Sequence, residues 1–205
     1  MYPARPGLLI GFHGCDQSVR NKIVNDQSML HNSTNDYDWL GNGMYFWENN
    51  RQRAFDFAEN LHANPQKGKE AINDPVVLGA VIDLGFCLDL LEKEFIGFVK
   101  QSYDTLKDLF SILELSLPQN SPLGTSKDLL MRKLDCAVIE NIHSLRRKEN
   151  RRPFDSTRGV FIEGEPLYPT AGFYEKSHIQ LCVRNPNSVK GFFIPREEDP
   201  KCLVP

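Results

Sequence analysis

Short apolar runs bounded by glycine, proline or polar residues predict that this chain builds a β-sheet. The most regular run, residues 76–84, is rich in β-branched side chains and lies between Pro75 and Gly85. The run at residues 8–12 is typical of a strand that is buried on both faces. The predicted strands cover residues 8–12, 44–47, 76–84, 159–163, 178–183 and 189–194.

Apolar residues at helical spacing predict helices between these strands. One short helix is expected at residues 17–24, and another from Arg51 to about residue 62. Two longer stripes between residues 88 and 148, separated by a break at 117–124, predict a helical hairpin packed on the strands, with Thr125 and Ser126 as the cap of its second helix. The stripes consist of Phe95, Phe98, Val99, Leu106, Leu109, Phe110 and Leu113, and of Leu130, Leu134, Ala137, Val138, Ile142 and Leu145.

The stretch that organises the rest of the chain begins with two glycines, Gly41 and Gly43. A Gly-x-Gly sequence permits positive φ angles and a close approach of the backbone to a ligand. The aromatic run that follows, residues 44–47, predicts a strand with Tyr45 and Trp47 on one face. Such a turn suits the binding of a flat ring, although the same residues also fit a plain hairpin beside a packed strand.

Composition and charge narrow the classes of protein. The chain has 205 residues, 40% hydrophobic and 25% charged, and a net charge of -3, which gives no general attraction for nucleic acid. The basic residues within 146–152 fit a solvated helix end, with a phosphate or nucleic-acid role as the alternative. Five scattered cysteines argue against a disulfide framework or a zinc site. Without a signal-like or 18-residue apolar segment, we expect a cytoplasmic protein that has neither a membrane nor a metal partner.

Three polar residues stand where the pattern otherwise predicts apolar residues or a plain turn. His13 closes the first strand against Gly14, which we expect to turn the chain; Tyr45 lies in the aromatic strand, and Gln180 lies within a later strand. Taken singly, a strand-end histidine fits a structural role and a mid-strand glutamine fits a solvent-facing one. Their order is more informative: a strand with His-Gly, then Gly-x-Gly-x-Tyr, then a strand with His-x-Gln.

This order resembles the ADP-ribosyltransferase superfamily, in its His-Tyr-Glu branch, which includes diphtheria-type toxins and poly(ADP-ribose) polymerases. Residues 12–14, Phe-His-Gly, are similar to the first motif of that branch. Residues 41–46, Gly-Asn-Gly-Met-Tyr-Phe, are similar to its second motif. The resemblance covers roughly residues 8–84 and 158–194 and leaves the helical hairpin unexplained.

The resemblance implies a role for each matching residue. His13 would hydrogen-bond the adenosine-side ribose of NAD, and the backbone of Gly14 would hold the nicotinamide amide. Tyr45 would stack on the nicotinamide ring, Gly43 would belong to the same NAD-binding turn, and Gln180 would orient the nicotinamide-side ribose. His13, Tyr45 and Gln180 are therefore the expected catalytic residues.

The third motif departs from the family, which has a glutamate where this sequence has Gln180, two residues after His178. An amide can hydrogen-bond a ribose hydroxyl, but it carries no charge and cannot take a proton. We therefore expect a slower or different reaction. Glu48 and Glu175 are candidates for a substitute carboxylate, although each also fits a surface or capping role. Phe57 is a candidate for a second aromatic ring against the nicotinamide.

We expect an α+β fold: a single domain over residues 1–205, with split, curved, mostly antiparallel sheets around an NAD cleft and a helical insertion at about 88–150. The expected activity is mono-ADP-ribosyl transfer from NAD, as a substrate, to a protein or nucleic-acid acceptor, in a toxin-like bacterial enzyme. The loop from Tyr168 to Glu175 is expected to recognise the acceptor.

Three alternatives stay open. A non-catalytic module that binds NAD or ADP-ribose agrees with the missing carboxylate. An RNA 2′-phosphotransferase-like enzyme of the same fold requires cations to converge, and Arg20, Arg53, Arg158 and Arg184 are available. A structural or interaction protein without a small ligand is the third.

Overall fold

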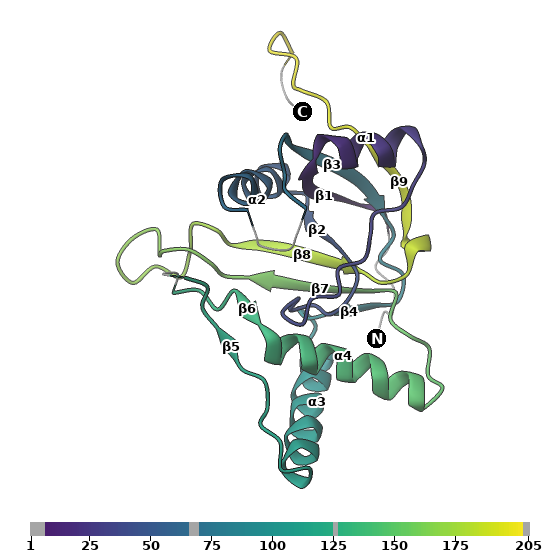
Figure 1. Cartoon of the computed structure of the whole chain (residues 1–205), viewed down its shortest axis with the longest axis vertical. Helices are drawn as coiled ribbons and strands as arrows, with labels where there is room; N and C mark the ends of the chain where they lie inside the picture. Colours follow the sequence, from purple (N-terminus) through teal and green to yellow (C-terminus); the bar gives the residue numbers. More distant parts are fainter. Residues whose placement is uncertain (1–6, 66–69, 125–126, 203–205) are drawn as a thin grey trace.

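The computed structural model describes residues 7–65, 70–124 and 127–202. In these residues the chain forms a seven-stranded mixed sheet, a two-stranded ribbon and four α-helices, which confirms the α+β class (Figure 1). The sheet has the strand order β4-β7-β8-β2-β1-β3-β9. Its strands are β1 (Leu9–Asp16), β2 (Met44–Glu48), β3 (Pro75–Ile82), β4 (Cys87–Asp89), β7 (Ser156–Phe161), β8 (His178–Val183) and β9 (Val189–Phe193). The other elements are α1 (Gln17–Asn25), α2 (Arg51–Ala63), α3 (Lys93–Ile112), β5 (Asn120–Ser121), β6 (Met131–Arg132), α4 (Lys133–Lys148) and the 3-10 helix η1 (Pro186–Ser188).

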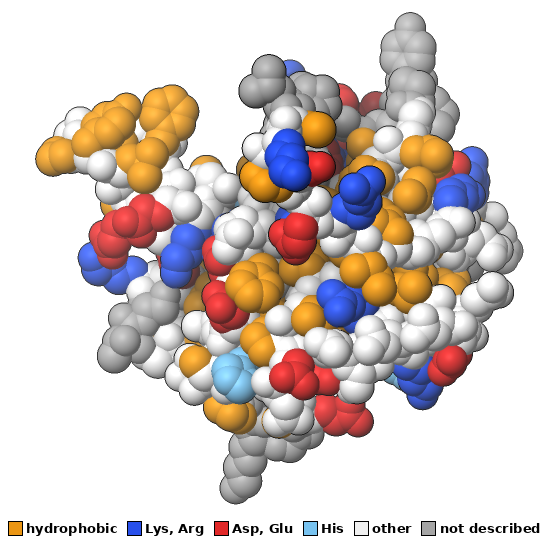
Figure 2. Space-filling model, turned by 90° about the horizontal axis from the view of Figure 1, so that it is seen from above, with side chains coloured by type: hydrophobic (Ala, Val, Ile, Leu, Met, Phe, Trp, Pro, Cys, Tyr) orange, Lys and Arg blue, Asp and Glu red, His pale blue; other side chains and the backbone are white. Residues whose placement is uncertain are grey.

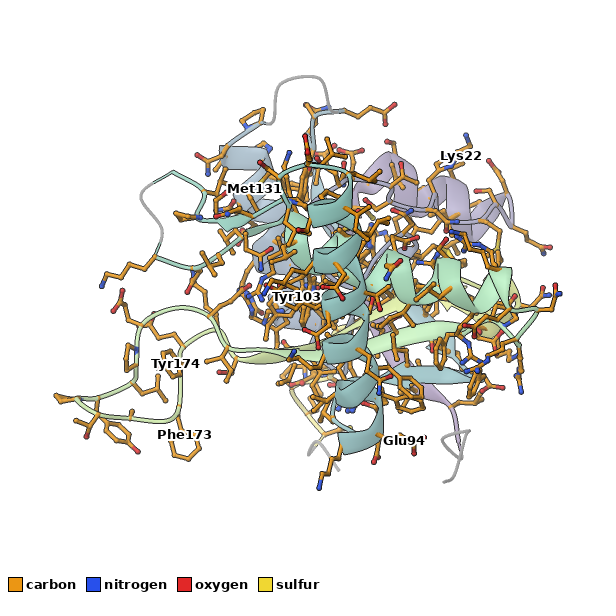
Figure 3. The ribbon with its side chains drawn as sticks, turned by 90° about the horizontal axis from the view of Figure 1, so that it is seen from below. Lys22, Glu94, Tyr103, Met131, Phe173 and Tyr174 are labelled. Carbon is orange, nitrogen blue, oxygen red and sulfur yellow. The ribbon has the colours of Figure 1, made fainter. Side chains whose placement is uncertain are left out.

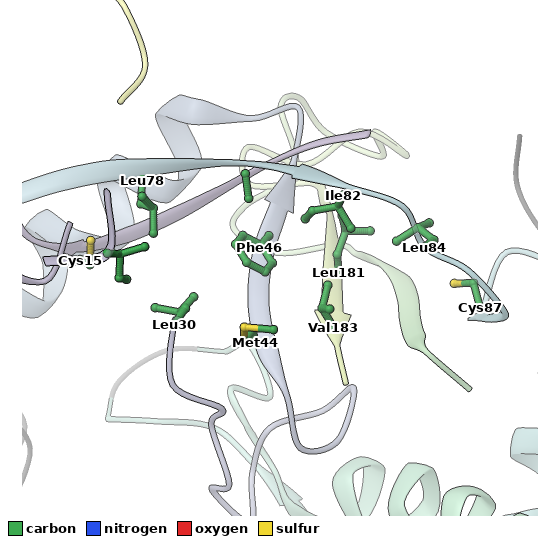
Figure 4. Packing of buried hydrophobic residues seen from close by; sticks show 12 residues of the cluster. Cys15, Leu30, Met44, Phe46, Leu78, Ile82, Leu84, Cys87, Leu181 and Val183 are labelled. Atoms are coloured by element: carbon green, nitrogen blue, oxygen red, sulfur yellow. The ribbon is translucent and has the colours of Figure 1, made fainter. Parts of the chain in front are cut away.

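The ladder of paired residues between neighbouring strands of the sheet is shortest between β1 and β2. These strands pair only at Gly11–Glu48 and Phe12–Trp47, whereas β1 pairs with β3 along its whole length, from Leu9 to Asp16. Two well-paired halves therefore meet at a short seam, and Figure 4 shows β1 and β3 crossing β2 and β8 at a steep angle. The strands of both halves therefore belong to one bent sheet, which corrects the prediction of separate, split sheets. Every neighbouring pair is antiparallel except β4 with β7, which is parallel.

The main hydrophobic core fills the angle between the two halves of the sheet (Figure 4). Met44 and Phe46 of β2 lie in this core, which is formed with buried residues of β1, β3 and β8. Trp47 packs on the opposite face, against Ala54 of α2 and Val77 of β3. The alternation predicted for residues 44–47 is therefore confirmed, because strand side chains point to opposite faces in turn.

The helical insertion packs against the β4 edge of the sheet. Leu88 of β4, Phe95 of α3 and Ile139 and Ile142 of α4 form a second buried cluster with Phe154. This confirms the predicted hairpin and its contact with the strands.

The start of the second insertion helix was predicted too early. The structure begins α4 at Lys133 and places Leu130 outside it, while Thr125 and Ser126 lie outside the described residues. The side chain of Asn120 supplies the cap, since its Oδ1 accepts hydrogen bonds from the backbone N–H groups of Leu134 (2.9 Å) and Asp135 (3.2 Å). A cap that comes from so far upstream leaves no local sequence signal.

Strand β1 was also predicted to end too early, with Gly14 as a turn. The structure continues β1 through Gly14 to Asp16, because β3 pairs with it over that whole range. The short strand β4 was missed, since three residues give no alternation to recognise.

Candidate functional site

His13 stands where the pairing of β1 with β2 ends. Its imidazole Nδ1 lies 2.9 Å from the carbonyl oxygen of Tyr45. Because a carbonyl can only accept, Nδ1 carries the proton, and the neutral ring keeps a lone pair on Nε2. Burial lowers the pKa of His13, and the bond to Tyr45 only partly opposes this effect. At neutral pH the ring is therefore a neutral group that can accept a hydrogen bond at Nε2.

Gly14 is buried and lies just beyond the same end of the β1–β2 ladder, where β1 has no partner on its β2 side among the described residues. The carbonyl of Ile10 accepts a hydrogen bond from the N–H of Asn49 (2.8 Å), so the polar backbone groups of Ile10 point toward β2. Because this orientation repeats at every second residue, the N–H and C=O of Gly14 also point toward β2, beyond the last pair at Phe12. A β-carbon on Gly14 would lie 2.0 Å from the carbonyl oxygen of Ala54, so only glycine fits beneath α2.

The two glycines of the turn before β2 are required for different reasons. Gly41 has a φ of 81°, which favours glycine, whereas a β-carbon on Gly43 would lie 2.6 Å from Sγ of Cys182. The hydroxyl of Tyr45 donates to the carbonyl of Gly41 (2.8 Å) and accepts from the N–H of Leu40 (3.0 Å). Burial raises the pKa of Tyr45 well above its usual value, so the hydroxyl stays protonated. The two hydrogen bonds of this hydroxyl fix the ring to the turn.

Gln180 lies at the centre of β8, opposite Trp47 of β2 on one side and Gly159 of β7 on the other. Its Oε1 accepts a hydrogen bond from Nε1 of Trp39 (3.0 Å). The Trp39 ring lies over Gly159, where a β-carbon would stand 3.0 Å from it. Because Trp39 can only donate, the network assigns the oxygen of Gln180 to Trp39 and leaves its NH₂ group as a donor.

The fold brings His13, Tyr45 and Gln180 onto three adjacent strands, β1, β2 and β8. It does not place all three side chains on one face. Phe12, Trp47 and Gln180 are cross-strand partners and share a face, so His13, the residue after Phe12, leaves β1 on the other face. Its ring lies 6.1 Å from that of Phe46, at the seam where β1 and β2 separate.

The two carboxylates considered as substitutes for the missing glutamate have other roles. Glu48 forms a two-point ion pair with Arg158 (2.6 and 2.9 Å) and follows Trp47 in β2, so it points away from the face of Gln180. Glu175 is an exposed loop residue whose Oε2 accepts a hydrogen bond from the N–H of Glu165 (3.3 Å). Neither stands beside Gln180.

A different carboxylate, Glu163, lies near this face. Its side chain is 11% exposed, and its Oε2 lies 3.6 Å from the guanidinium of Arg53. Burial raises the pKa of Glu163, with Arg132 and Arg53 opposing the effect. Glu163 lies two residues beyond the end of β7, four positions after Gly159, the partner of Gln180, and its carboxylate pairs with Arg53.

Aromatic and basic side chains lie near Gln180; the sequence singled out His178, Phe57 and Arg53 among them, but not Phe161 or Arg132. The rings of His178 and Phe161 stack 5.1 Å apart, and the guanidinium of Arg132 lies 4.5 Å from the Phe161 ring. The ring of Trp47 lies 6.2 Å from that of His178 and 5.0 Å from that of Phe57. Among the described residues, the buried side-chain nitrogens without a hydrogen-bond partner include Trp47 Nε1, His178 Nε2, Arg53 Nε and Arg132 Nε. The sequence signals for this cluster are the His-x-Gln pattern at residues 178–180 and the aromatic and basic residues of the helix after Arg51.

The buried histidines predict a loss of stability in mild acid. Burial lowers the pKa of His178 to about 4 and that of His143 to about 3. The unfolded chain therefore binds protons first as the pH falls below about 6.5, and each histidine costs about 2 kcal/mol of stability at pH 5. Urea unfolding at pH 7 and pH 5 measures this loss. We expect His178→Phe, which keeps a ring against Phe161, to lose less stability between these pH values than the wild type; an equal loss would contradict the assignment.

The arginines that could have converged on a phosphate site are held separately. Arg158 pairs with Glu48 and Asp89, Arg184 pairs with Glu140, and Arg53 pairs with Glu163. Arg20 lies on α1, where its positive charge partly opposes the rise that burial causes in the pKa of the Cys15 thiol.

The basic run at residues 146–152 has structural contacts. Arg146 lies over the rings of Phe154 (4.4 Å) and Phe86 (5.1 Å), and Arg152 pairs with Asp155 (3.1 Å). Arg146 and Arg152 therefore hold the C-terminal end of α4 against the residues that follow it.

Comparisons with known proteins identified no relative of this chain. Searches against protein-family models, curated proteins and solved structures each found no match. Within residues 7–65, 70–124 and 127–202, no helix is long and apolar enough to cross a membrane, and no group of three or more His, Cys, Asp or Glu residues is arranged to hold a metal ion. The five cysteines are free thiols, of which only Cys202 is exposed.

Proposed function

We propose that this protein is an ADP-ribosyltransferase that releases nicotinamide from NAD and transfers ADP-ribose to a macromolecular acceptor. One observation carries the proposal: the ladder between β1 and β2 stops at Phe12–Trp47, and the next residues are His13 and Gly14. The backbone donor and acceptor of Gly14 then point toward the open edge. A carboxamide such as that of nicotinamide has one donor group and one acceptor group, which match this edge.

The other predicted residues have roles that fit their contacts. Nε2 of His13 would accept a hydrogen bond from a ribose hydroxyl. Tyr45, fixed to the turn by its hydroxyl, would offer its ring face to the nicotinamide. Gln180, with its oxygen bonded to Trp39, would donate from its NH₂ group to an oxygen of the second ribose.

The chemistry would proceed without a carboxylate at the third motif. Cleavage of the nicotinamide N-glycosidic bond develops positive charge on the ribose, and an adjacent carboxylate would stabilise that charge. Gln180 supplies orientation but no negative charge, so the proposed enzyme would be slow. Gln180→Glu is expected to raise the rate by at least about 10-fold, because the new carboxylate still accepts from Trp39 and adds the missing charge.

Nicotinamide release from NAD by the purified protein tests the proposal. His13→Ala should abolish release, since it removes the ribose contact and opens the seam, whereas His31→Ala alters an exposed histidine and should not. Gln180→Ala should lower release and Gln180→Glu should raise it. Release that survives unchanged in His13→Ala would reject the assignment.

A module that binds NAD or ADP-ribose without turnover is the second candidate. The ion pair of Glu48 favours this candidate. Glu48 follows the β2 residue that pairs with Gln180, and its carboxylate is already bound to Arg158. NAD binding that His13→Ala removes, with no nicotinamide release by the wild type or by Gln180→Glu, would support this candidate. The phosphotransferase alternative is not favoured, because its arginines do not converge.

The acceptor would contact the loop between β7 and β8. Leu167, Tyr168 and Phe173 are 60%, 55% and 67% exposed, and hydrophobic side chains gather on this projection (Figure 2). Figure 3 shows Phe173 and Tyr174 on the loop, away from the body of the molecule. The loop is closed by a bridge between Pro166 and Tyr174, which would hold its tip in place.

A further inference from the structure

Helix α4 of the insertion packs on the glycine turn through Ile139 and hydrogen-bonds it through one carboxylate. Oε1 of Glu140 accepts a hydrogen bond from the backbone N–H of Asn42 (2.8 Å). Arg184, which directly follows β8, donates from one guanidinium nitrogen both to the carbonyl of Asn42 (2.8 Å) and to Glu140 (2.5 Å). The N–H and the C=O of Asn42 are therefore both bound by charged side chains from distant parts of the chain.

The turn is shaped around this ion pair. A β-carbon on Gly41 would lie 2.5 Å from Oε1 of Glu140 and 3.1 Å from the guanidinium of Arg184. Glycine at this position therefore serves two purposes: it allows the positive φ and it leaves room for the pair. The side chains of Glu140 and Arg184 are 25% and 16% exposed, so water screens their charges only in part.

The same turn holds the Tyr45 ring. The hydroxyl of Tyr45 is bound to Gly41 and Leu40, the residues that immediately precede Asn42. The flanking residue Gly43 is bridged to Ser33, a backbone contact that does not reach Asn42. A continuous chain of contacts thus runs from α4 through Asn42 and Gly41 to Tyr45.

We propose that the helical insertion is a clamp for the glycine turn, and that Glu140, paired with Arg184, is the positioning residue that sets the place of Tyr45. This explains why an insertion on the β4 edge accompanies the open seam on the far side of β2. The effect of the clamp on NAD turnover rests on the proposed function, whereas its effect on the turn does not.

Amide hydrogen exchange tests the clamp without any assay of activity. In Glu140→Ala, exchange of the Asn42 amide should accelerate about 10- to 100-fold, because a hydrogen bond to a charged group is lost. The Phe46 amide, in the ladder between β2 and β8, reports global unfolding and should change much less. Glu149→Ala removes an exposed carboxylate from the end of the same helix and should leave both amides unchanged.

Conservative variants separate positioning from a loss of folding. Glu140→Gln keeps an oxygen that can accept from Asn42 and should restore much of the protection. Equal acceleration of Asn42 and Phe46 would overturn the proposal, because the residue would then only support the whole fold. Unchanged protection of Asn42 in Glu140→Ala would overturn it as well.

The link to turnover is measured on the same variants. If the wild type releases nicotinamide, Glu140→Ala should lower kcat/KM by at least about 10-fold and Glu140→Gln by less. If the wild type releases none, the proposed function fails while the exchange data still decide the clamp. If release is unaffected although Asn42 loses protection, the clamp holds the turn but does not position a catalytic group, and the role assigned to Glu140 is rejected.

Discussion

Gly14→Ala is expected to destabilise the protein by about 3 kcal/mol or more. The added β-carbon would stand 2.0 Å from the backbone carbonyl oxygen of Ala54 and 3.2 Å from the β-carbon of Ala58. A backbone carbonyl within a helix cannot rotate away, so α2 as a whole must move off the sheet. That movement would also disturb Trp47, which packs against Ala54. Urea unfolding at neutral pH measures the loss.

Gly191→Ala is the matched control for this variant. Gly191 is also a strand glycine, in β9, but a β-carbon there would meet no atom within 4 Å. Its stability should therefore stay within about 0.5 kcal/mol of the wild type or rise slightly. A loss for Gly14→Ala as small as that of Gly191→Ala would show that α2 is not tightly packed on β1 in solution, and that the edge at Gly14 is shaped differently.

The contrast between Gly14 and its sequence context shows what local patterns can predict. The alternation at residues 44–47 and the helical spacing after Arg51 were both confirmed, because each depends on neighbours a few residues apart. The local context of Gly14 predicts a turn. In the structure this glycine is required by a helix forty residues later, and nothing near it in the sequence carries that information.

The candidate site shows the same limit. The sequence predicts strands that carry His13, Tyr45 and Gln180 within a split pair of sheets, and the structure places these strands next to one another in a single sheet. It does not predict the partners of these residues, because Trp39 is 141 residues from Gln180 and Glu140 is 98 residues from Asn42. These two contacts decide how the amide of Gln180 points and how the turn is held.

The carboxylates were the least predictable part of the site. Glu48 directly follows the aromatic strand, and its position alone made it a candidate for the reaction. Its ion pair with Arg158 spans 110 residues and two strands, so only the folded structure reveals that its charge is already bound. The strength of that pair therefore decides whether Glu48 is available for chemistry.

Arg158→Ala is expected to destabilise the protein by about 3–5 kcal/mol. The side chain of Arg158 is only 6% exposed, and it pairs with Glu48 (2.6 Å) and with Asp89 (3.4 Å), which are 16% and 5% exposed. The hydrogen bond to Glu48 raises the pKa of Arg158, so the guanidinium is charged at neutral pH. Removal of the cation takes Arg158 away from two largely buried carboxylates, which costs more than the lost contacts alone.

Urea unfolding again gives the measurement, with Arg51→Ala as the control. Arg51 forms a comparable pair with Glu197, but the two side chains are 42% and 82% exposed, so its loss should cost less than about 1 kcal/mol. Adding Glu48→Gln and Asp89→Asn to Arg158→Ala should recover part of the stability, because the uncompensated charges are then gone. If Arg158→Ala were instead as mild as Arg51→Ala, the pair would be loose in solution. Glu48 would then be a free carboxylate, which would contradict the ion pair that we assign to it.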